Sequence, residues 1–199
     1  RPALRHSLSV VNRSADARLA LAAIVVAHTA MVSVMVMTPI HMQHVDVSLV
    51  IIGVVISVHI LGMYAFSPLV GLASDRIGRR PVLAGGAILL LAACLVSGTA
   101  AADDSIGLGV GLFLLGLGWS CGLVAGSTLL TESVPEPERP GVQGASDLLM
   151  NTAGAVGGAV AGVIFAVATY GWLALIAAVP AALLLMWLLR ARVRPAASV

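Results

Sequence analysis

Six long apolar runs separated by short charged connections are the feature that most constrains this chain. They cover about residues 18–40, 48–73, 81–101, 105–130, 143–169 and 171–189. A helix needs roughly 20 apolar residues to cross the hydrocarbon core of a bilayer. The 199 residues are also 59% hydrophobic, with a mean hydropathy of +1.04, which is too apolar for a water-soluble domain of this length. The sequence therefore predicts an all-α integral membrane protein with six transmembrane helices.

The basic residues predict how these helices are oriented. All eleven are arginines, and they fall before the first run, after the second, after the fourth and after the sixth: Arg1, Arg5, Arg13, Arg18, Arg76, Arg79, Arg80, Arg139, Arg190, Arg192 and Arg194. The other connections carry acids and no basic residue: Asp46, Asp103 and Asp104. Because basic loops stay on the cytoplasmic side, we expect a multi-pass protein of the plasma (inner) membrane with both termini cytoplasmic.

Three parts are expected: a lead-in over residues 1–17, a six-helix bundle over 18–189 and a cytoplasmic tail over 190–199. The arginine-rich lead-in is typical of a linker or of an amphipathic surface segment that contacts anionic lipid headgroups. The first residue is arginine rather than methionine, which favours a fragment of a longer protein.

Prolines and glycines predict local features of the helices. Pro81 is expected in a first helical turn, Pro68 and Pro180 are expected to kink their helices, and a stiff non-helical loop is expected around Pro135, Pro137 and Pro140. Glycines at every fourth position predict close helix contacts, at Gly118, Gly122 and Gly126 and at Gly154, Gly158 and Gly162. The third and sixth runs have almost no polar side chains and are expected to face lipid.

Polar side chains inside the other runs are candidate functional groups. His28 and His59 are the ionisable groups deepest in the predicted membrane, where an imidazole either relays protons and binds substrate or donates to a backbone carbonyl. Asp147 lies about one turn into the fifth run, and Asn151 follows one turn later on the same face. Asp147 is either a gate or coupling carboxylate or an acid favoured by the helix dipole.

Two short motifs have weaker support. Residues 118–122 match G-x-S-x-G, but Ser120 is predicted mid-helix, where a nucleophile elbow does not form. The segment 41–44 holds His41 and His44 and is expected to be an interfacial loop, because a metal site needs more ligands than Asp46 nearby. The cysteines lie in apolar runs without a C-x-x-C pattern, so neither a metal site nor a cofactor is expected.

The connection after the second run has the form G-x-x-x-D-R-x-G-R-R, from Gly71 to Arg80. This pattern matches the signature that major facilitator superfamily transporters carry between their second and third helices, with a version between the eighth and ninth. The six runs, the arginine loops and the connection from Pro135 through Arg139 to Gly144 also resemble this family. The resemblance covers the whole chain.

The resemblance implies helices seven to twelve of a twelve-helix bundle, built from two inverted three-helix repeats. By resemblance, the first and fourth runs line a central cavity, while the second and fifth pack against the missing N-terminal six-helix half. The implied gating motif comprises Gly71, Asp75, Arg76, Gly78, Arg79 and Arg80. Its candidate partners are Glu132, Arg139 and Asp147. The candidate cavity or proton-path residues are His28, Thr29, Ser33, His59, Trp119, Ser120 and Asn151.

The implied function is secondary active transport of a small molecule by alternating access, without catalytic residues or a cofactor. Little charge in the cavity favours proton-driven export of a drug or hydrophobic compound. The alternative is a self-standing six-helix membrane protein that dimerises as a half-transporter or scaffold. An intramembrane serine hydrolase acting through Ser120 is a third hypothesis. No pattern in the sequence indicates nucleic-acid binding.

Overall fold

A computed structural model describes residues 4–192 of the chain, and this part is all-helical apart from its connections. Six helical segments are long and apolar enough to cross a membrane, which confirms the predicted fold class and number of spans. Arg1, Arg194 and most of the predicted tail lie outside the described residues.

The helices follow the predicted order with three additions: a short first helix, a division of the second span and a one-turn 3₁₀ helix before the fifth. Their bounds are α1 Leu4–Asn12, α2 Ala15–Gln43, α3 Leu49–Tyr64, α4 Ser67–Ile77, α5 Arg79–Thr99, α6 Ser105–Glu132, the 3₁₀ helix η1 Glu136–Glu138, α7 Arg139–Val167 and α8 Tyr170–Arg192.

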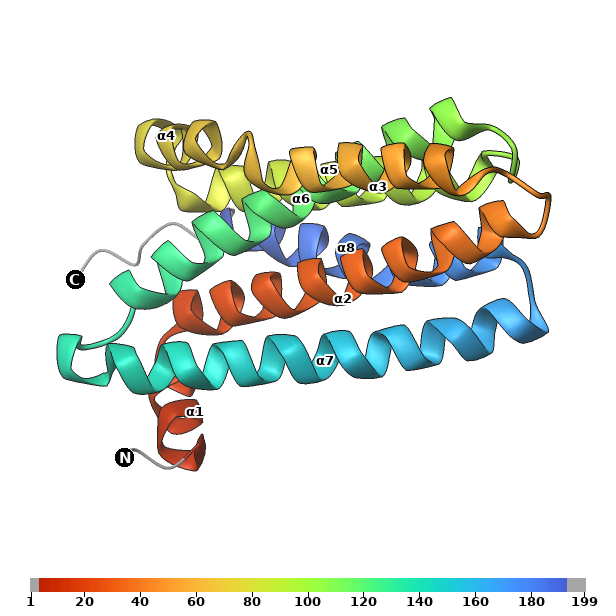
Figure 1. Cartoon of the computed structure of the whole chain (residues 1–199). Coiled ribbons are helices and arrows are strands. Elements are labelled where there is room, and N and C mark those ends of the chain that lie inside the picture. Colours follow the sequence, from red (N-terminus) through yellow and green to blue (C-terminus); the bar gives the residue numbers. More distant parts are fainter. Residues whose placement is uncertain (1–3, 193–199) are drawn as a thin grey trace.

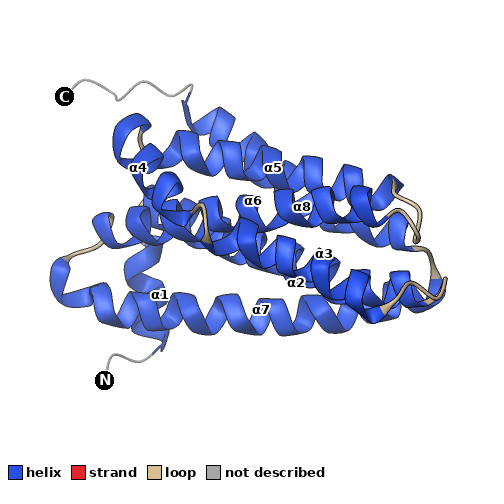
Figure 2. Ribbon diagram, turned by 45° about the horizontal axis from the view of Figure 1, so that its top comes forward, coloured by secondary structure: helices blue, strands red, loops and turns tan. Residues whose placement is uncertain are grey.

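Helix α6 lies at the centre of the bundle and packs against α2, α3 and α5. Helix α7 lies along α2, and α8 packs against both α5 and α2 (Figure 1 and Figure 2). Many residues of α6 are therefore buried, whereas α7 buries only a few. The expectation that the third run faces lipid is wrong for much of α5, because apolar neighbours cover it on both sides; low polarity alone does not distinguish lipid from a packed helix. Most large apolar side chains of α8 are exposed, as expected.

Four segments gather at one end of the bundle, which we call the arginine end. They are α1, the α4–α5 connection, the α6–α7 connection and the end of α8, at the left of Figure 1. Every described arginine belongs to one of these segments or to the first turns of α2 and α5 beside them. The connections at the opposite end contain Asp46, Asp103 and Asp104. Two spans lie between one basic segment and the next, so the chain returns to the same end of the bundle each time.

The second predicted span is not one continuous helix. Helix α3 ends at Tyr64 and α4 begins at Ser67, with Pro68 in its first turn. The break lies just before the proline, which has no N–H to donate to the Tyr64 carbonyl four residues earlier. Ser67 Oγ donates to the Tyr64 carbonyl at 2.8 Å, so one of the acceptors freed by the break keeps a partner. Pro180 lies inside the continuous helix α8.

The predicted non-helical loop around three prolines is mostly wrong. Pro137 lies in η1, and Pro140 lies in the first turn of α7, which leaves residues 133–135 as the irregular link. The first N–H groups of a helix have no intrahelical acceptor, so a proline there forfeits nothing. Pro81 occupies the equivalent place in α5, as predicted.

The lead-in is also partly helical. Helix α1 buries Ser7, Val10 and Val11 and exposes its other face, so it is amphipathic. Helix α2 begins at Ala15, three residues before the predicted span, because Ser14 caps it by accepting a hydrogen bond from the Ala17 N–H.

Glycines allow the central helix to approach its neighbours closely. Gly122 belongs to a predicted repeat, whereas Gly62 and Gly116 were not among the predicted glycines. A Cβ built on Gly116 of α6 would lie 2.4 Å from the His59 carbonyl oxygen of α3. A Cβ on Gly62 of α3 would lie 2.5 Å from the Phe113 carbonyl oxygen of α6. On the α2 side, a Cβ on Gly122 would lie 2.6 Å from the Ala27 side chain. Helices α3 and α6 thus meet backbone to backbone.

Substituting Gly116 by alanine is expected to destabilise the bundle, because a methyl group there forces α3 and α6 apart. Overpacking of this kind costs about 1–3 kcal/mol, so the midpoint of thermal unfolding in detergent should fall by several degrees. Gly109→Ala on the same helix is the matched control, because no atom lies within 4 Å of its added Cβ. Equal midpoints for the two variants would contradict the close contact.

Candidate gate and membrane-embedded polar site

The guanidinium of Arg79 joins three helices at the arginine end. Its Nη1 donates to the Ser74 carbonyl of α4 at 2.7 Å and lies 3.0 Å from Asp75 Oδ1. Its Nη2 donates to Glu132 Oε1 at 2.9 Å. Arg79 is the first residue of α5, and Glu132 is the last residue of α6. One side chain therefore holds the end of α4 and the end of α6 against the start of α5.

The electrostatics of this contact favour an arginine. Ser74 and Glu132 lie in the last turns of their helices, where unpaired carbonyls concentrate negative charge. A cation between two such ends is stabilised by both, and a planar guanidinium donates to several oxygens at once. The Arg79 side chain is 21% exposed, against 53% for Glu132 and 71% for Asp75. Water and salt therefore weaken each ion pair, and the contacts of Arg79 together, rather than any single pair, hold the helix ends in place.

Gly78 makes the sharp turn that places Arg79. It is the single residue between α4 and α5, with φ +93° and ψ 160°. A side chain is strongly disfavoured in that region, so the motif requires glycine here. The Gly78 N–H donates to the Ser74 carbonyl at 3.1 Å, so this carbonyl accepts both from Gly78 and from Arg79.

A second pair at this end was not predicted from the sequence. Arg80 contacts Asp16 Oδ1 through Nη2 and through Nε, the latter at 3.1 Å. Asp16 lies in the first turn of α2, so the pair links the start of α5 to the start of α2. A carboxylate in a first helical turn is ordinary by itself, and its partner is 64 residues away in sequence. No local pattern reveals such a pair.

The other candidates at this end are placed differently. Of the predicted partners, the structure brings Glu132 to the motif but not Arg139 or Asp147. Arg76, Arg139 and Asp147 are exposed and form no ion pair within residues 4–192. Asn151 Nδ2 donates to the Asp147 carbonyl at 2.8 Å, an ordinary contact within α7. Gly71 faces open space, with no atom within 4 Å of an added Cβ.

Among the predicted cavity residues, His28 and Trp119 are in direct contact. Trp119 Nε1 of α6 donates to His28 Nδ1 of α2 at 3.1 Å, and the Tyr64 ring of α3 meets the Trp119 ring edge-on at 5.8 Å. Gly154 makes room on α7, because a Cβ there would lie 2.6 Å from His28 Cδ2. Helices α2, α6 and α7 thus meet at one half-buried imidazole, and α3 contacts its partner Trp119; the imidazole Nδ1 is an acceptor and therefore unprotonated.

Thr29 and Ser33 belong to a different place. They line a small pocket of about 140 Å³ between α2, α7 and α8, and Thr29 Oγ1 donates to its own helix at the Val25 carbonyl. Ser120 is buried in α6, and its Oγ has no hydrogen-bond partner. Within the described residues, Thr29 and Ser33 thus line a pocket that does not include His28 or Trp119, because successive positions on a helix point to different neighbours.

His59 matches the simpler of its two interpretations. It is fully buried between α3 and α6, and its Nδ1 donates to the Leu112 carbonyl at 2.7 Å. Its Nε2 has no partner in the described part of the chain. The ring therefore contributes a contact between helices, with one nitrogen unused.

The two weaker motifs are also explained by helix packing. Ser120 lies mid-helix, without the strand–turn–helix geometry or the hydrogen-bonded base of a nucleophile elbow. His41 lies in the last turn of α2 rather than in a loop, and its ring stacks on Tyr170 at 4.4 Å; His44 stacks on Phe165 at 5.5 Å. Within residues 4–192, no group of three potential metal ligands is found.

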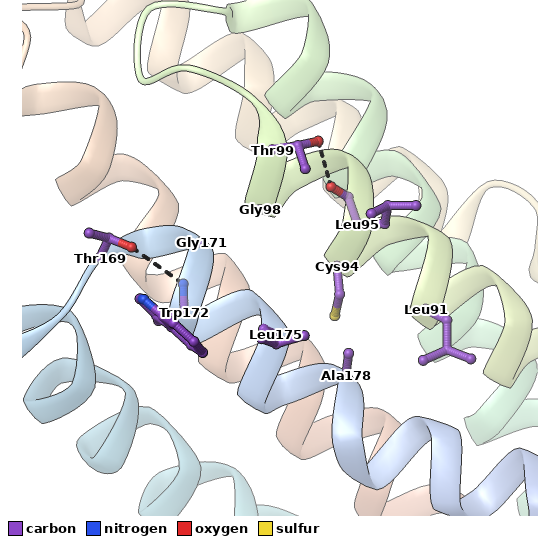
Figure 3. Close-up of a pocket in the computed structure, with 10 residues that line it drawn as sticks. All are labelled: Leu91, Cys94, Leu95, Gly98, Thr99, Thr169, Gly171, Trp172, Leu175 and Ala178. Atoms are coloured by element: carbon purple, nitrogen blue, oxygen red, sulfur yellow. Dashed lines mark hydrogen bonds between the residues drawn. The ribbon is translucent and has the colours of Figure 1, made fainter.

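A pocket of about 470 Å³ lies between α5 and α8, away from these polar residues (Figure 3). Its lining is almost entirely apolar, with Cys94, Leu175 and Trp172 on its walls and Thr99 and Thr169 near its end. Both threonine hydroxyls are engaged with backbone groups, those of Leu95 and Trp172. The lining of this pocket has no charged side chain, so a ligand would be recognised there by its shape.

The comparison with known families agrees with this arrangement. Residues 19–199 match the model of the Major Facilitator Superfamily. The chain belongs to the major facilitator superfamily. The signature from Gly71 to Arg80 therefore occurs in a chain of that family, and it lies at the connection where α4, α5 and α6 meet.

Two bacterial relatives are similar over most of the chain. The uncharacterized MFS-type transporter YddS of Bacillus subtilis (strain 168) is 40% identical over 161 residues, which is 81% of this chain and 37% of that protein. The uncharacterized MFS-type transporter YdeG of the same organism is 39% identical over 155 residues, or 78% of this chain and 36% of that protein. The match thus spans little more than a third of the length of each relative.

The two glycines of the motif are expected to respond differently to alanine. Gly78→Ala should lower the thermal midpoint of this chain, because alanine at φ +93° costs on the order of 1–3 kcal/mol. Gly71→Ala should leave it unchanged, because the added methyl group meets open space. Unfolding of both variants in one detergent, followed by circular dichroism, checks this. A loss of stability in Gly71→Ala equal to that in Gly78→Ala would contradict the assigned geometry.

Proposed function

We propose that this six-helix bundle is the C-terminal half of a secondary active transporter that moves a small molecule across the plasma (inner) membrane by alternating access. The bridge from Arg79 to α4 and α6 is the observation that carries the proposal. Under this proposal the arginine end is cytoplasmic, as the charge of its connections favours.

The proposed role of the bridge is to make the arginine end of the bundle move as one piece. In a rocking mechanism each half rotates as a body, so the ends of its helices must remain locked together. Arg79 locks α4, α5 and α6, and the pair of Arg80 with Asp16 adds α2. Asp75 and Arg76 remain exposed and are available to a facing helix in one of the two states. A contact formed in only one state shifts the equilibrium between them.

The exposed faces of α3, α4 and α7 are evidence for a partner outside this six-helix bundle. Large apolar side chains are exposed along them, including Val54, Leu61 and Leu148, and Gly71 on α4 presents open space. Small and apolar residues are typical of a helix contact inside a membrane. We assign these faces to the proposed N-terminal six-helix half, and the length of the relatives is compatible with such a half.

The contact between His28 and Trp119 is the proposed site of proton coupling or substrate binding. His28 is the one histidine of the described membrane spans whose ring hydrogen-bonds to another side chain. The surroundings carry little charge, which favours a drug or hydrophobic compound as the exported substrate. Protons are the proposed coupling ion, because an imidazole titrates near neutral pH.

The alternative is a bundle that dimerises as a half-transporter or scaffold through the same exposed faces. The coding sequence upstream of Arg1 separates the two. Six further spans with a matching arginine connection would support the first proposal, whereas a start codon directly upstream would support the alternative.

Transport by the full-length protein is expected to depend on the charges of the bridge. Arg79→Gln and Glu132→Gln should each reduce proton-driven uptake of a lipophilic fluorescent cation into inverted vesicles by roughly tenfold, a typical effect of losing a charge-assisted contact. The charge swap Arg79→Glu with Glu132→Arg should restore part of the activity. Arg139→Gln is the control, since this exposed arginine forms no pair within the described residues. Full activity in Arg79→Gln would refute the locking role.

A further inference from the structure

A pocket of about 590 Å³ lies at the arginine end, between α1, α2 and α7. Its wall is apolar except for Thr152 and for Asn12 and Arg18, which lie between the end of α1 and the first turn of α2; we call this part of the pocket its mouth. It is lined by Leu8, Val11, Asn12, Arg18, Leu21, Ala22, Val25, Leu149, Thr152, Ala153 and Val156. Neither the gate nor the contact of His28 with Trp119 includes any of these residues.

Helix α1 is fixed over this pocket on one side. Val10 and Val11 are buried, and His6 Nε2 lies 3.0 Å from the carboxylate of Glu138. The Arg18 guanidinium donates from Nη1 to the Asn12 carbonyl at the end of α1. Helix α1 therefore covers one side of the pocket, and the Arg18 guanidinium lies at its edge.

The pocket opens sideways, on an apolar flank of α7. With roughly 100° per residue along a helix, Leu149 and Val156 point about opposite to Asp147 and Asn151. The same flank continues as exposed valines, Val156, Val160 and Val163, at 58%, 50% and 64%. It also leads one turn further to the small pocket beside α8. An exposed apolar flank within a membrane-spanning helix is a surface for hydrocarbon.

The mouth of the pocket carries an excess of positive charge. Arg5, Arg13 and Arg18 are exposed within the first 18 residues. The acid of this segment, Asp16, is engaged by Arg80, and His6 faces Glu138. Basic clusters next to a membrane span attract anionic lipids near the membrane surface.

We propose that this pocket binds an anionic phospholipid from the leaflet at the arginine end. One acyl chain fills the apolar space between α2 and α7, and the phosphate lies against the guanidinium of Arg18 beneath α1. Apolar walls alone would accept any lipid, whereas the arginine at the mouth selects a headgroup that keeps a net negative charge. The site is independent of the substrate and of the coupling ion.

Native mass spectrometry of the full-length protein tests the proposal. The probes are phosphatidylglycerol and phosphatidylethanolamine with identical acyl chains, added at equal concentration. Phosphatidylglycerol is expected to remain bound preferentially, and Arg18→Gln is expected to reduce its retention by roughly tenfold. Ala22→Phe, which fills the pocket, should reduce the retention of both lipids, and Arg18→Lys should preserve the preference.

Arg13→Gln is the matched control, because Arg13 is exposed on the same segment but does not line the pocket. Equal retention of the two lipids by the unsubstituted protein would overturn the proposal. An equal loss in Arg13→Gln and Arg18→Gln would also overturn it, by showing attraction to the whole basic segment. Retention of neither lipid would be a third contrary result, because it would mean that the remainder of a longer protein covers the flank.

Discussion

The exclusion of charge from hydrocarbon is the constraint on which the rest of this structure depends. Ionised groups are costly inside a bilayer, so they must lie at the ends of the helices or in protected contacts. This sequence assigns the arginines to one end and leaves three acids in the connections of the other. At the arginine end the charges do more than mark a side of the membrane. Arg79 and Arg80 bind carboxylates and carbonyls from α2, α4 and α6, so the same residues fasten the helices together.

Inside the membrane, packing replaces charge as the organising interaction. The approach of α3 to α6 depends on Gly62 and Gly116, which place each helix against the backbone of the other. Polar side chains in this region are few and are mostly bonded to a nearby carbonyl, as for Thr29 and His59. Two hydrogen bonds differ, because each joins side chains of separate helices: the bond from Trp119 to His28 and the bond between Thr38 and Tyr170. A bundle with a fastened end and a tightly packed middle is suited to moving as one body.

Glu132 was one of three candidate partners that the resemblance implied for the motif. The number of spans, the family and the contacts of the repeated glycines of α6 were predictable from the sequence. Each follows from a local pattern: hydropathy, a signature motif, or glycines at every fourth position. The pair of Arg80 with Asp16 was not predictable, because it joins residues distant in sequence and depends on how two helix starts are placed. The separation of Thr29 and Ser33 from His28 was missed because a shared helix does not imply a shared face. The first turns at Pro137 and Pro140 show that a proline-rich link can still be helical.

The most direct measurement is the accessibility of single cysteines at the two ends of the bundle. Asp103→Cys and Glu136→Cys replace exposed acids at opposite ends, and the native cysteines Cys94 and Cys121 are buried and give little background. The topology predicts that a membrane-impermeant maleimide labels Cys at position 103 in intact cells, and labels position 136 only after permeabilisation. Labelling of position 136 in intact cells, with position 103 protected, would invert the topology and contradict the cytoplasmic gate.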